Sequence, residues 1–160
     1  MIFLSSDLIS KTIFSLELGD DIAVIEEGII NPETLSIVAF KVKSPELNYQ
    51  AVVFADDIRE THPEGFVVDG MKNIVPFDAN LVRLQQVLKL NFDIFKLKVE
   101  DSEGKRVGAI SEYAFNTDNF QINRLYVKPK SLKDKIIDKT IAVGRGQIVK
   151  LSNKRIIVNT

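Results

Sequence analysis

The sequence has no cysteine, no tryptophan and a single histidine among its 160 residues. Without cysteine there is no disulfide, thiolate nucleophile or thiolate metal ligand, and such a composition fits a reducing cytoplasm, where we expect the protein. One histidine without cysteine also argues against zinc, so we expect no metal and no other cofactor. No segment approaches the ~18 consecutive apolar residues of a membrane-spanning helix. The first apolar run, Ile2–Leu4, is too short for a signal peptide and has no basic flank.

Charge is unevenly distributed along the chain, although the formal net charge is only −1. Residues 1–90 contain 7 Lys/Arg and 14 Asp/Glu, whereas residues 91–160 contain 14 Lys/Arg and 8 Asp/Glu. An anionic partner for the basic half would explain this asymmetry. Attraction between the two halves, within one chain or in a head-to-tail homodimer, would explain it equally well.

The sequence repeats itself with a period of 85 residues. Seven of the 25 positions from Gly19 to Lys43 are identical to those 85 residues later. The match resumes with a shift of 90 at Ile58, which aligns with Ile148. The five extra residues of the second copy fall near 129–140, where a loop can absorb them.

Both copies have the short apolar runs and turn residues of β-strands. We expect strands at 12–16, 22–30, 35–43, 49–54 and 65–69, and at 94–99, 107–115, 120–128, 140–143, 146–151 and 155–159. Gly19 and Gly104 suit turns that need a positive φ. The apolar alternation changes parity at the same place in both copies, between Ile37 and Phe40 and between Ile122 and Leu125, which indicates a β-bulge or strong coiling.

One helix is expected between the copies, at residues 78–90. Asp78 can cap it, and Leu81, Leu84 and Leu88 form one stripe. We interpret it as a connector packed on a barrel, with a partner-binding helix as the alternative. A second short helix is expected at 132–137.

These patterns predict an all-β protein of two small β-barrels in tandem, joined by a short α-helix. The first repeat spans residues 1–77, the connecting helix 78–90 and the second repeat 91–160. Repeats of ~70 residues bury only about 60% of their unfolded surface, so they should pack on each other or share an element. We expect each copy to keep its own apolar interior.

The order and spacing of these residues resemble the PRC-barrel family. Its pattern runs roughly L-I-G-K-x-V, a turn glycine, I-G-x-V-x-D, D-P-x-T-G and an apolar strand. The first copy matches it through residues 8–13, Gly19, 22–27, 29–34 and 37–42, and the second through Gly104, Val107-Gly108, Ile110, Glu112 and Phe120–Val127. Ser10, Ala23 and Leu35 stand where the family often has glycine, and Glu27 and Asn31 replace common aspartates.

The resemblance implies a tandem PRC-barrel protein of a bacterial type. Known members of the family include the cytoplasmic domain of the reaction-centre H subunit and the C-terminal domain of a ribosome maturation factor, which both dock onto other macromolecules. Fold analogy alone is weak support for a function.

No pattern of catalytic residues is apparent, and we expect no enzyme. His62 lies in a turn-like stretch without a nucleophile motif. Gly144-Arg145-Gly146 is interpreted as a hairpin turn because it matches no nucleotide-binding loop. Glu27 and Glu112 occupy the same position in the two copies, and we expect them to fix turns by accepting backbone N–H groups.

A basic stretch with Tyr126 in its midst is the one candidate for macromolecule binding. Its residues are Arg124, Lys128, Lys130, Lys133, Lys135 and Lys139. Nucleic acid favours such charge with an aromatic side chain to stack on, but Asp134 and Asp138 interrupt the stretch. A solvated face, a protein partner or the acidic half are the alternatives, and an anionic membrane surface is the least favoured.

The leading hypothesis is therefore a non-catalytic adaptor or interaction module that binds another macromolecule, most readily a protein. The first alternative is an RNA- or ribosome-associated factor that uses the basic second repeat. The second is a small-ligand binder or enzyme with a pocket that the sequence does not reveal.

Overall fold

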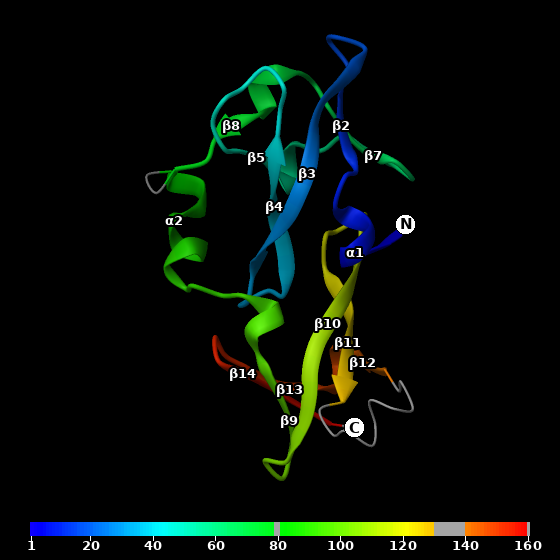
Figure 1. Ribbon diagram of the computed structural model, residues 1–160, viewed down its shortest axis with the longest axis vertical. Coiled ribbons are helices and arrows are strands. Elements are labelled where there is room, and N and C mark those ends of the chain that lie inside the picture. Colours follow the sequence, from blue (N-terminus) through cyan, green and yellow to red (C-terminus); the bar gives the residue numbers. More distant parts are fainter. Residues whose placement is uncertain (79–80, 130–139, 160) are drawn as a thin grey trace.

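The computed structural model describes residues 1–78, 81–129 and 140–159. This part of the chain is mostly β, and its strands form two seven-stranded sheets, one in each half of the elongated molecule (Figure 1). The first sheet, in the order β6-β7-β2-β3-β4-β5-β8, contains β2 (Thr12–Ser15), β3 (Asp20–Asn31), β4 (Ser36–Lys43), β5 (Ala51–Phe54), β6 (Glu60–His62), β7 (Gly65–Val68) and β8 (Val75–Pro76). The second, in the order β12-β11-β10-β9-β14-β13 with β1 beside β10, contains β1 (Ile2–Leu4), β9 (Lys98–Asp101), β10 (Arg106–Asn116), β11 (Ile122–Pro129), β12 (Ile141–Gly144), β13 (Ile148–Leu151) and β14 (Arg155–Val158).

Short helices connect these strands. They are α1 (Ser5–Leu8), α2 (Val82–Lys89) and the 3-10 helices η1 (Ala55–Asp57), η2 (Met71–Asn73), η3 (Ile94–Lys96) and η4 (Arg145–Gln147). None of the helices in the described ranges is both long and apolar enough to cross a membrane.

The repeat in the sequence is also a repeat in the topology. The strands β6-β7-β2-β3-β4-β5 of the first sheet follow one another in the same order as β13-β14-β9-β10-β11-β12 of the second. In each sheet one pair is parallel, β2 with β7 and β9 with β14, while the long central pairs β3–β4 and β10–β11 are antiparallel. The turns at Gly19 and Gly104 both have the expected positive φ, 64° and 82°.

The expected irregularity is present at the same place in both copies. The pairing of β3 with β4 shifts register between Ile25 and Glu27 and again between Ile29 and Ile30. The pairing of β10 with β11 shifts at the positions 85 residues later. The second shift in each pair accounts for the change of parity in the sequence, so the prediction of a bulge is confirmed.

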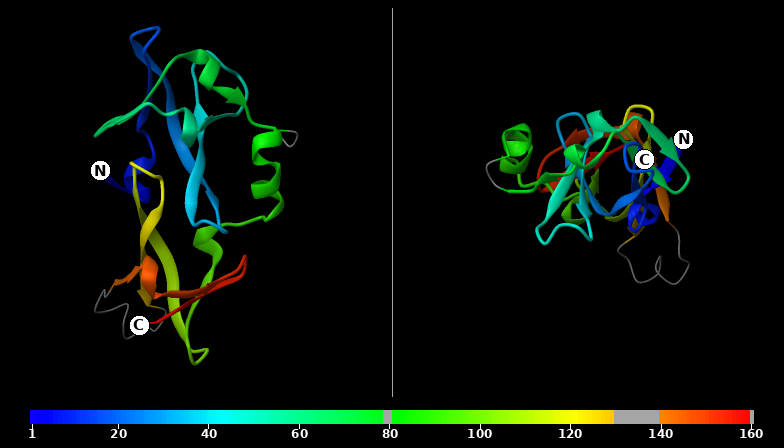
Figure 2. Two further views of the ribbon diagram at one scale, coloured as in Figure 1. Left: turned by 180° about the vertical axis from the view of Figure 1, so that it is seen from behind. Right: turned by 90° about the horizontal axis from the view of Figure 1, so that it is seen from above.

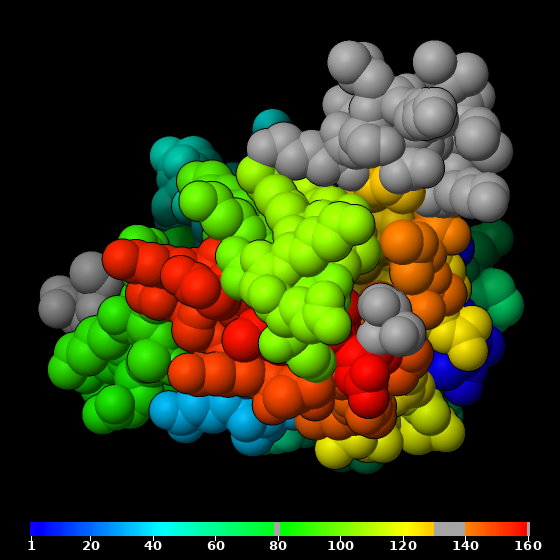
Figure 3. Space-filling view, turned by 90° about the horizontal axis from the view of Figure 1, so that it is seen from below, coloured from blue at the N-terminus to red at the C-terminus, as the bar shows by residue number. Residues whose placement is uncertain are grey.

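Backbone hydrogen bonds join the two halves where the β3–β4 turn meets the β10–β11 turn. Ile37 N donates to Phe120 O (2.9 Å), and Ile122 N donates to Leu35 O (3.0 Å). Leu35 and Phe120 occupy equivalent positions and both have a left-handed backbone, with φ of 47° and 58°. In the view of Figure 3, the light-blue surface of the first half adjoins the orange and red surface of the C-terminal strands.

Strand β1 provides a second link, because it belongs to the first half of the chain but pairs with β10 of the second sheet. Its Phe3 lies in a cluster of rings from both halves, 5.7 Å from Phe66 and 6.0 Å from Phe115 between centroids. Most buried side chains of both halves therefore belong to one continuous core, beside a smaller separate cluster in the first half. The expectation that the repeats pack together is confirmed, and the expectation of a separate apolar interior in each copy is wrong.

Helix α2 lies at one side of the molecule (Figure 2) and packs on the first sheet. Leu84 is buried against Ala39, Val52 and Phe54, and the other two leucines of the expected stripe pack around the same cluster. The helix begins at Val82, with Leu81 rather than Asp78 in the N-cap position. The helix expected at 78–90 was therefore too long, since the described helix spans Val82–Lys89.

Two other expectations concern local structure in the second half. The strand expected at 94–99 begins with the helix η3 instead, because the Asp93 side chain accepts Phe95 N and so caps a helical turn. The helix expected at 132–137 lies outside the described residues.

Candidate functional site

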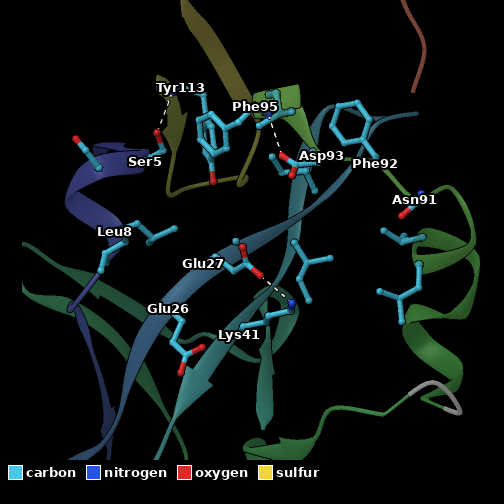
Figure 4. Close-up of a pocket in the computed structure, with 18 of the residues that line it drawn as sticks. Ser5, Leu8, Glu26, Glu27, Lys41, Asn91, Phe92, Asp93, Phe95 and Tyr113 are labelled. Carbon is cyan, nitrogen blue, oxygen red and sulfur yellow. Dashed lines mark hydrogen bonds and ion pairs between the residues drawn. The ribbon is translucent and has the colours of Figure 1, made fainter. Parts of the chain in front are cut away.

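A cavity of about 510 Å³ lies where the two repeats meet (Figure 4). We call it the inter-repeat pocket. Its walls come from α1, the bulged part of β3, the end of α2, the segment leading into η3, and β10. Its apolar side chains are Leu8, Ile9, Ile29, Ile30, Phe77, Val87, Leu88, Phe92, Ile94 and Phe95.

A charged pair lies within these apolar walls. Glu27 Oε1 is 2.8 Å from Lys41 Nζ. Lys41 Nζ also lies over the Phe77 ring, 5.0 Å from its centroid, which is a favourable cation–π distance. Lys41 is thus engaged twice, while Glu27 has Lys41 as its only ion-pair partner among the described residues and its side chain remains 59% exposed.

Tyr113 of β10 reaches into the pocket from the opposite wall (Figure 4). The residue is only 3% exposed. Its ring stacks on Phe95 at 5.9 Å, and its backbone N–H donates to Ser5 Oγ at 3.0 Å. Its hydroxyl points toward Glu27 and forms no hydrogen bond within the described part of the chain. Burial, and secondarily the negative charge of Glu27, raise the pKa of this hydroxyl well above its ordinary value, so it is neutral at physiological pH.

Tyr113 fits because the residue facing it has no side chain. A Cβ on Gly28 would stand 3.0 Å from the Tyr113 hydroxyl oxygen. Gly28 and Tyr113 are 85 residues apart and so occupy equivalent positions in the two copies. The two copies therefore differ at the pocket. The first copy has Gly28, which lacks a side chain, and the second has the phenol of Tyr113.

The pocket has more negative than positive groups. Among the described residues that line it, Glu26, Glu27 and Asp93 are acidic and Lys41 is basic. One oxygen of Asp93 accepts Phe95 N, and the other is 3.9 Å from the exposed Lys96 ammonium. The field inside the pocket therefore favours a positive charge.

The paired glutamates behave differently from each other. Glu112 accepts the backbone N–H of Ser6 at 3.1 Å and also the Ser6 hydroxyl, so it holds α1 against β10. Glu27 pairs with Lys41 instead. The expectation of a backbone acceptor is thus confirmed for Glu112, although its partner is α1 and not a turn, and it is wrong for Glu27.

The predicted basic face lies only partly within the described residues. Arg124 and Lys128 are exposed on β11 with Tyr126 between them, and none of these three lines the inter-repeat pocket. Lys130, Lys133, Lys135 and Lys139 lie outside the described residues.

The other candidates from the sequence lie outside the inter-repeat pocket. His62 is exposed on β6 and is 3.4 Å from Glu60. Within residues 1–78, 81–129 and 140–159, no three side chains of the metal-binding types cluster closely enough to hold an ion. Residues 144–146 do not form the expected hairpin turn, because β12 and β13 lie at opposite ends of their sheet and η4 connects them.

Arg145 is a structural residue that no sequence pattern singles out. Its guanidinium donates to Leu35 O (3.0 Å) and Thr34 O (2.5 Å) of the first half and to Ile122 O (2.9 Å) of the second half. It therefore satisfies the carbonyls of the junction between the two halves.

A scan against models of protein families and a search of curated proteins both give no match for this chain. The sequence reasoning also missed the pocket, because its walls come from segments 5–30, 77–95 and 111–113 and from Lys41. One signal was present in the sequence: the replacement of Gly28 by Tyr113 at the same position of the repeat.

Proposed function

We propose that this protein is a non-catalytic binding module made of two PRC-barrel-like repeats, and that it binds its ligand in the inter-repeat pocket. The repeated strand order and the bulges at equivalent positions support the tandem PRC-barrel interpretation. The left-handed backbone of Leu35 also supports it, since the family often has glycine at this position.

The size and lining of the pocket support ligand binding. A volume of about 510 Å³ lies within the range of roughly 300–1,000 Å³ typical of ligand sites. Such sites combine apolar walls with a few polar groups that orient the ligand. Here the orienting groups are the Glu27 carboxylate and the Tyr113 hydroxyl.

The Tyr113 hydroxyl is the observation that carries the proposal. It points into the cavity and has no hydrogen-bond partner among the described residues. Since no side-chain N or O atom of the described residues is both buried and unpartnered, this hydroxyl is open to the cavity, where water or a ligand can reach it. A ligand that hydrogen-bonds to it would take the place of water at a defined polar point among apolar side chains.

A binding role without catalysis agrees with the chemistry of the lining. Lys41 is paired with Glu27, and the single histidine is exposed on β6, away from the pocket lining. In an adaptor, the occupant would be a side chain of a partner protein. A free small molecule would use the same groups.

The test compares two tryptophan variants of α2. Val87 lines the pocket, whereas Val82 on the same helix is 77% exposed and does not line it. We expect Val87→Trp to fill the pocket and Val82→Trp to leave it open. A fragment library of mixed charge, screened by ¹H–¹⁵N NMR, should shift the amide signals of Gly28 and Tyr113 in the natural protein and in V82W, but not in V87W.

Two outcomes would contradict the proposal. The first is that no fragment shifts these signals. The second is that the fragments bind V87W as tightly as V82W. Circular dichroism and melting curves of the two variants establish that both are folded, so that a loss of binding reports the pocket.

A further inference from the structure

The charges around the inter-repeat pocket carry an inference about the class of ligand. We propose, resting on the binding function above, that the pocket selects a ligand with one positively charged head group on an apolar stem. A primary ammonium on an aliphatic chain is the simplest example.

The head group has a defined place between two side chains. The Glu27 carboxylate and the Tyr113 hydroxyl face each other across the pocket (Figure 4). The Glu27 side chain is 59% exposed beside Lys41, and the Tyr113 hydroxyl has no hydrogen-bond partner within the described residues, although the residue as a whole is only 3% exposed. An ammonium between them donates one N–H to the carboxylate and another to the phenol oxygen.

A negatively charged head group is disfavoured by the same contacts. To pair with Lys41, such a group would have to displace both the ion pair of Lys41 with Glu27 and its cation–π contact with the Phe77 ring. It would also meet a lining that contains three acidic residues, Glu26, Glu27 and Asp93, and one basic residue, Lys41. Like charges in a partly desolvated cavity repel more strongly than in water.

The apolar stem has a matching surface. Leu8 comes from α1 and Ile29 from β3, Leu88 comes from α2, and Phe92 lies between α2 and η3. Each buried methylene of the stem contributes about 0.8 kcal/mol, so a chain of several carbons binds better than a small cation such as ammonium itself.

The test uses three probes with the same six-carbon stem: hexylammonium, hexanoate and 1-hexanol. Dissociation constants come from the shifts of the Gly28 and Tyr113 amide signals in ¹⁵N-labelled protein. We expect hexylammonium to bind at least about tenfold more tightly than hexanoate, because a charge-assisted hydrogen bond is worth roughly 1.5–3 kcal/mol. In V87W the shifts should disappear.

A matched pair of charge variants isolates Glu27. Glu27→Gln removes the carboxylate of the pocket, whereas Glu46→Gln removes an exposed one that does not line it. We expect E27Q to weaken hexylammonium about tenfold, to strengthen hexanoate because Lys41 loses its partner, and to leave hexanol unchanged. We expect E46Q to change none of the three.

The outcomes separate this inference from the proposed function. Hexanoate bound in the pocket as tightly as hexylammonium would overturn the charge preference and leave the binding function standing. If none of the three probes binds but fragments from the screen do bind in the pocket, the charge preference is likewise overturned and the binding function stands. If neither the three probes nor any fragment binds in the pocket, both proposals are overturned.

The same chemistry can come from a free amine or from a lysine side chain of a partner protein. A ten-residue peptide with one central lysine, and the same peptide with norleucine in its place, distinguish these sources. If the lysine peptide binds more tightly than hexylammonium and the norleucine peptide does not, the head group belongs to a protein. If hexylammonium binds more tightly than the lysine peptide, the head group belongs to a free amine. Either of these affinity rankings supports the inference. If the two peptides bind equally and hexylammonium does not bind, the inference is overturned.

Discussion

Gly28 and Tyr113 occupy the same position in the two copies of the repeat and face each other at the inter-repeat pocket. The phenol oxygen would be 3.0 Å from a Cβ on Gly28, which is tighter than an ordinary van der Waals contact. Duplication alone would have placed identical residues here. The difference between the copies therefore supplies the pocket with a hydroxyl and leaves room for it beside Gly28.

This relationship predicts a coupled effect of two substitutions. Gly28→Ala should lower the free energy of unfolding by about 1–3 kcal/mol, because the new methyl group overpacks against the Tyr113 hydroxyl. The cost should be smaller in a Tyr113→Phe background, which a double-mutant cycle by urea denaturation measures. Gly146→Ala is the control, since a methyl group added there would have no atom within 4 Å. Equal costs in both backgrounds would contradict the contact.

The hydrogen bonds of the Arg145 guanidinium lead us to expect that this one side chain stabilises the junction between the two halves. Arg145→Ala should lower the free energy of unfolding by about 2 kcal/mol, because three carbonyl oxygens lose a charged donor. Arg145→Lys should restore less than half of this loss, since an ammonium cannot match the planar fork of donors. Arg106→Ala, an exposed change on β10, should have little effect. A denaturation midpoint for R145A equal to that of R106A would exclude the proposed role.

The raised pKa of Tyr113 predicts a loss of stability at alkaline pH. The unfolded chain releases this proton near pH 10, the ordinary tyrosine pKa, while the folded protein retains it to higher pH. The contribution is therefore fully present below about pH 10 and declines as the pH rises further. Urea denaturation between about pH 8 and 11 should show a steeper decline for the natural protein than for Tyr113→Phe. Tyr49→Phe, at an exposed position, should decline as steeply as the natural protein.

Phe3 predicts that the two halves unfold together. Phe3→Ala should lower the free energy of unfolding by about 3–5 kcal/mol, because it leaves a cavity among rings from both halves. Thermal unfolding should remain a single transition at a lower temperature, as expected for one continuous core. Ile2→Ala on the same strand is the control, since Ile2 is exposed. Two separate transitions in the natural protein would contradict a shared core.

Local features of the fold could be predicted from the sequence where neighbouring residues determine them. The turn glycines Gly19 and Gly104 have the expected positive φ, and the change of apolar parity in both copies marks a bulge. Comparison of the two copies strengthened the prediction of the bulge beyond what a single strand would support, because the same irregularity occurred twice. The Asp93 cap converted the start of the expected strand at 94–99 into a helical turn, since a side-chain hydrogen bond outweighed apolar composition.

Features that depend on distant residues could not be predicted. β1 has three residues, and its partners in β10 lie more than 100 positions away, as in the pairing of Ile2 with Asn116. The contact of Arg145 with Thr34 is equally remote in sequence. The pocket needs the packed arrangement of both copies and the connector, so composition and periodicity carried no direct sign of it. The basic stretch Arg124–Lys139 remains a prediction, since only Arg124 and Lys128 of its basic residues are described.

The placement of β1 has a consequence for how the protein reaches its native state during synthesis. β1 leaves the ribosome early, but the strand on which it lies, β10, is made only after the whole of the first sheet. Until then the Phe3 ring has no strand to hold it, and contacts between such widely separated segments form slowly. The first half can therefore complete its packing only after β10 of the second half has been synthesised. On a ribosome stalled before residue 106, residues 2–4 of the chain should still be cleaved by protease.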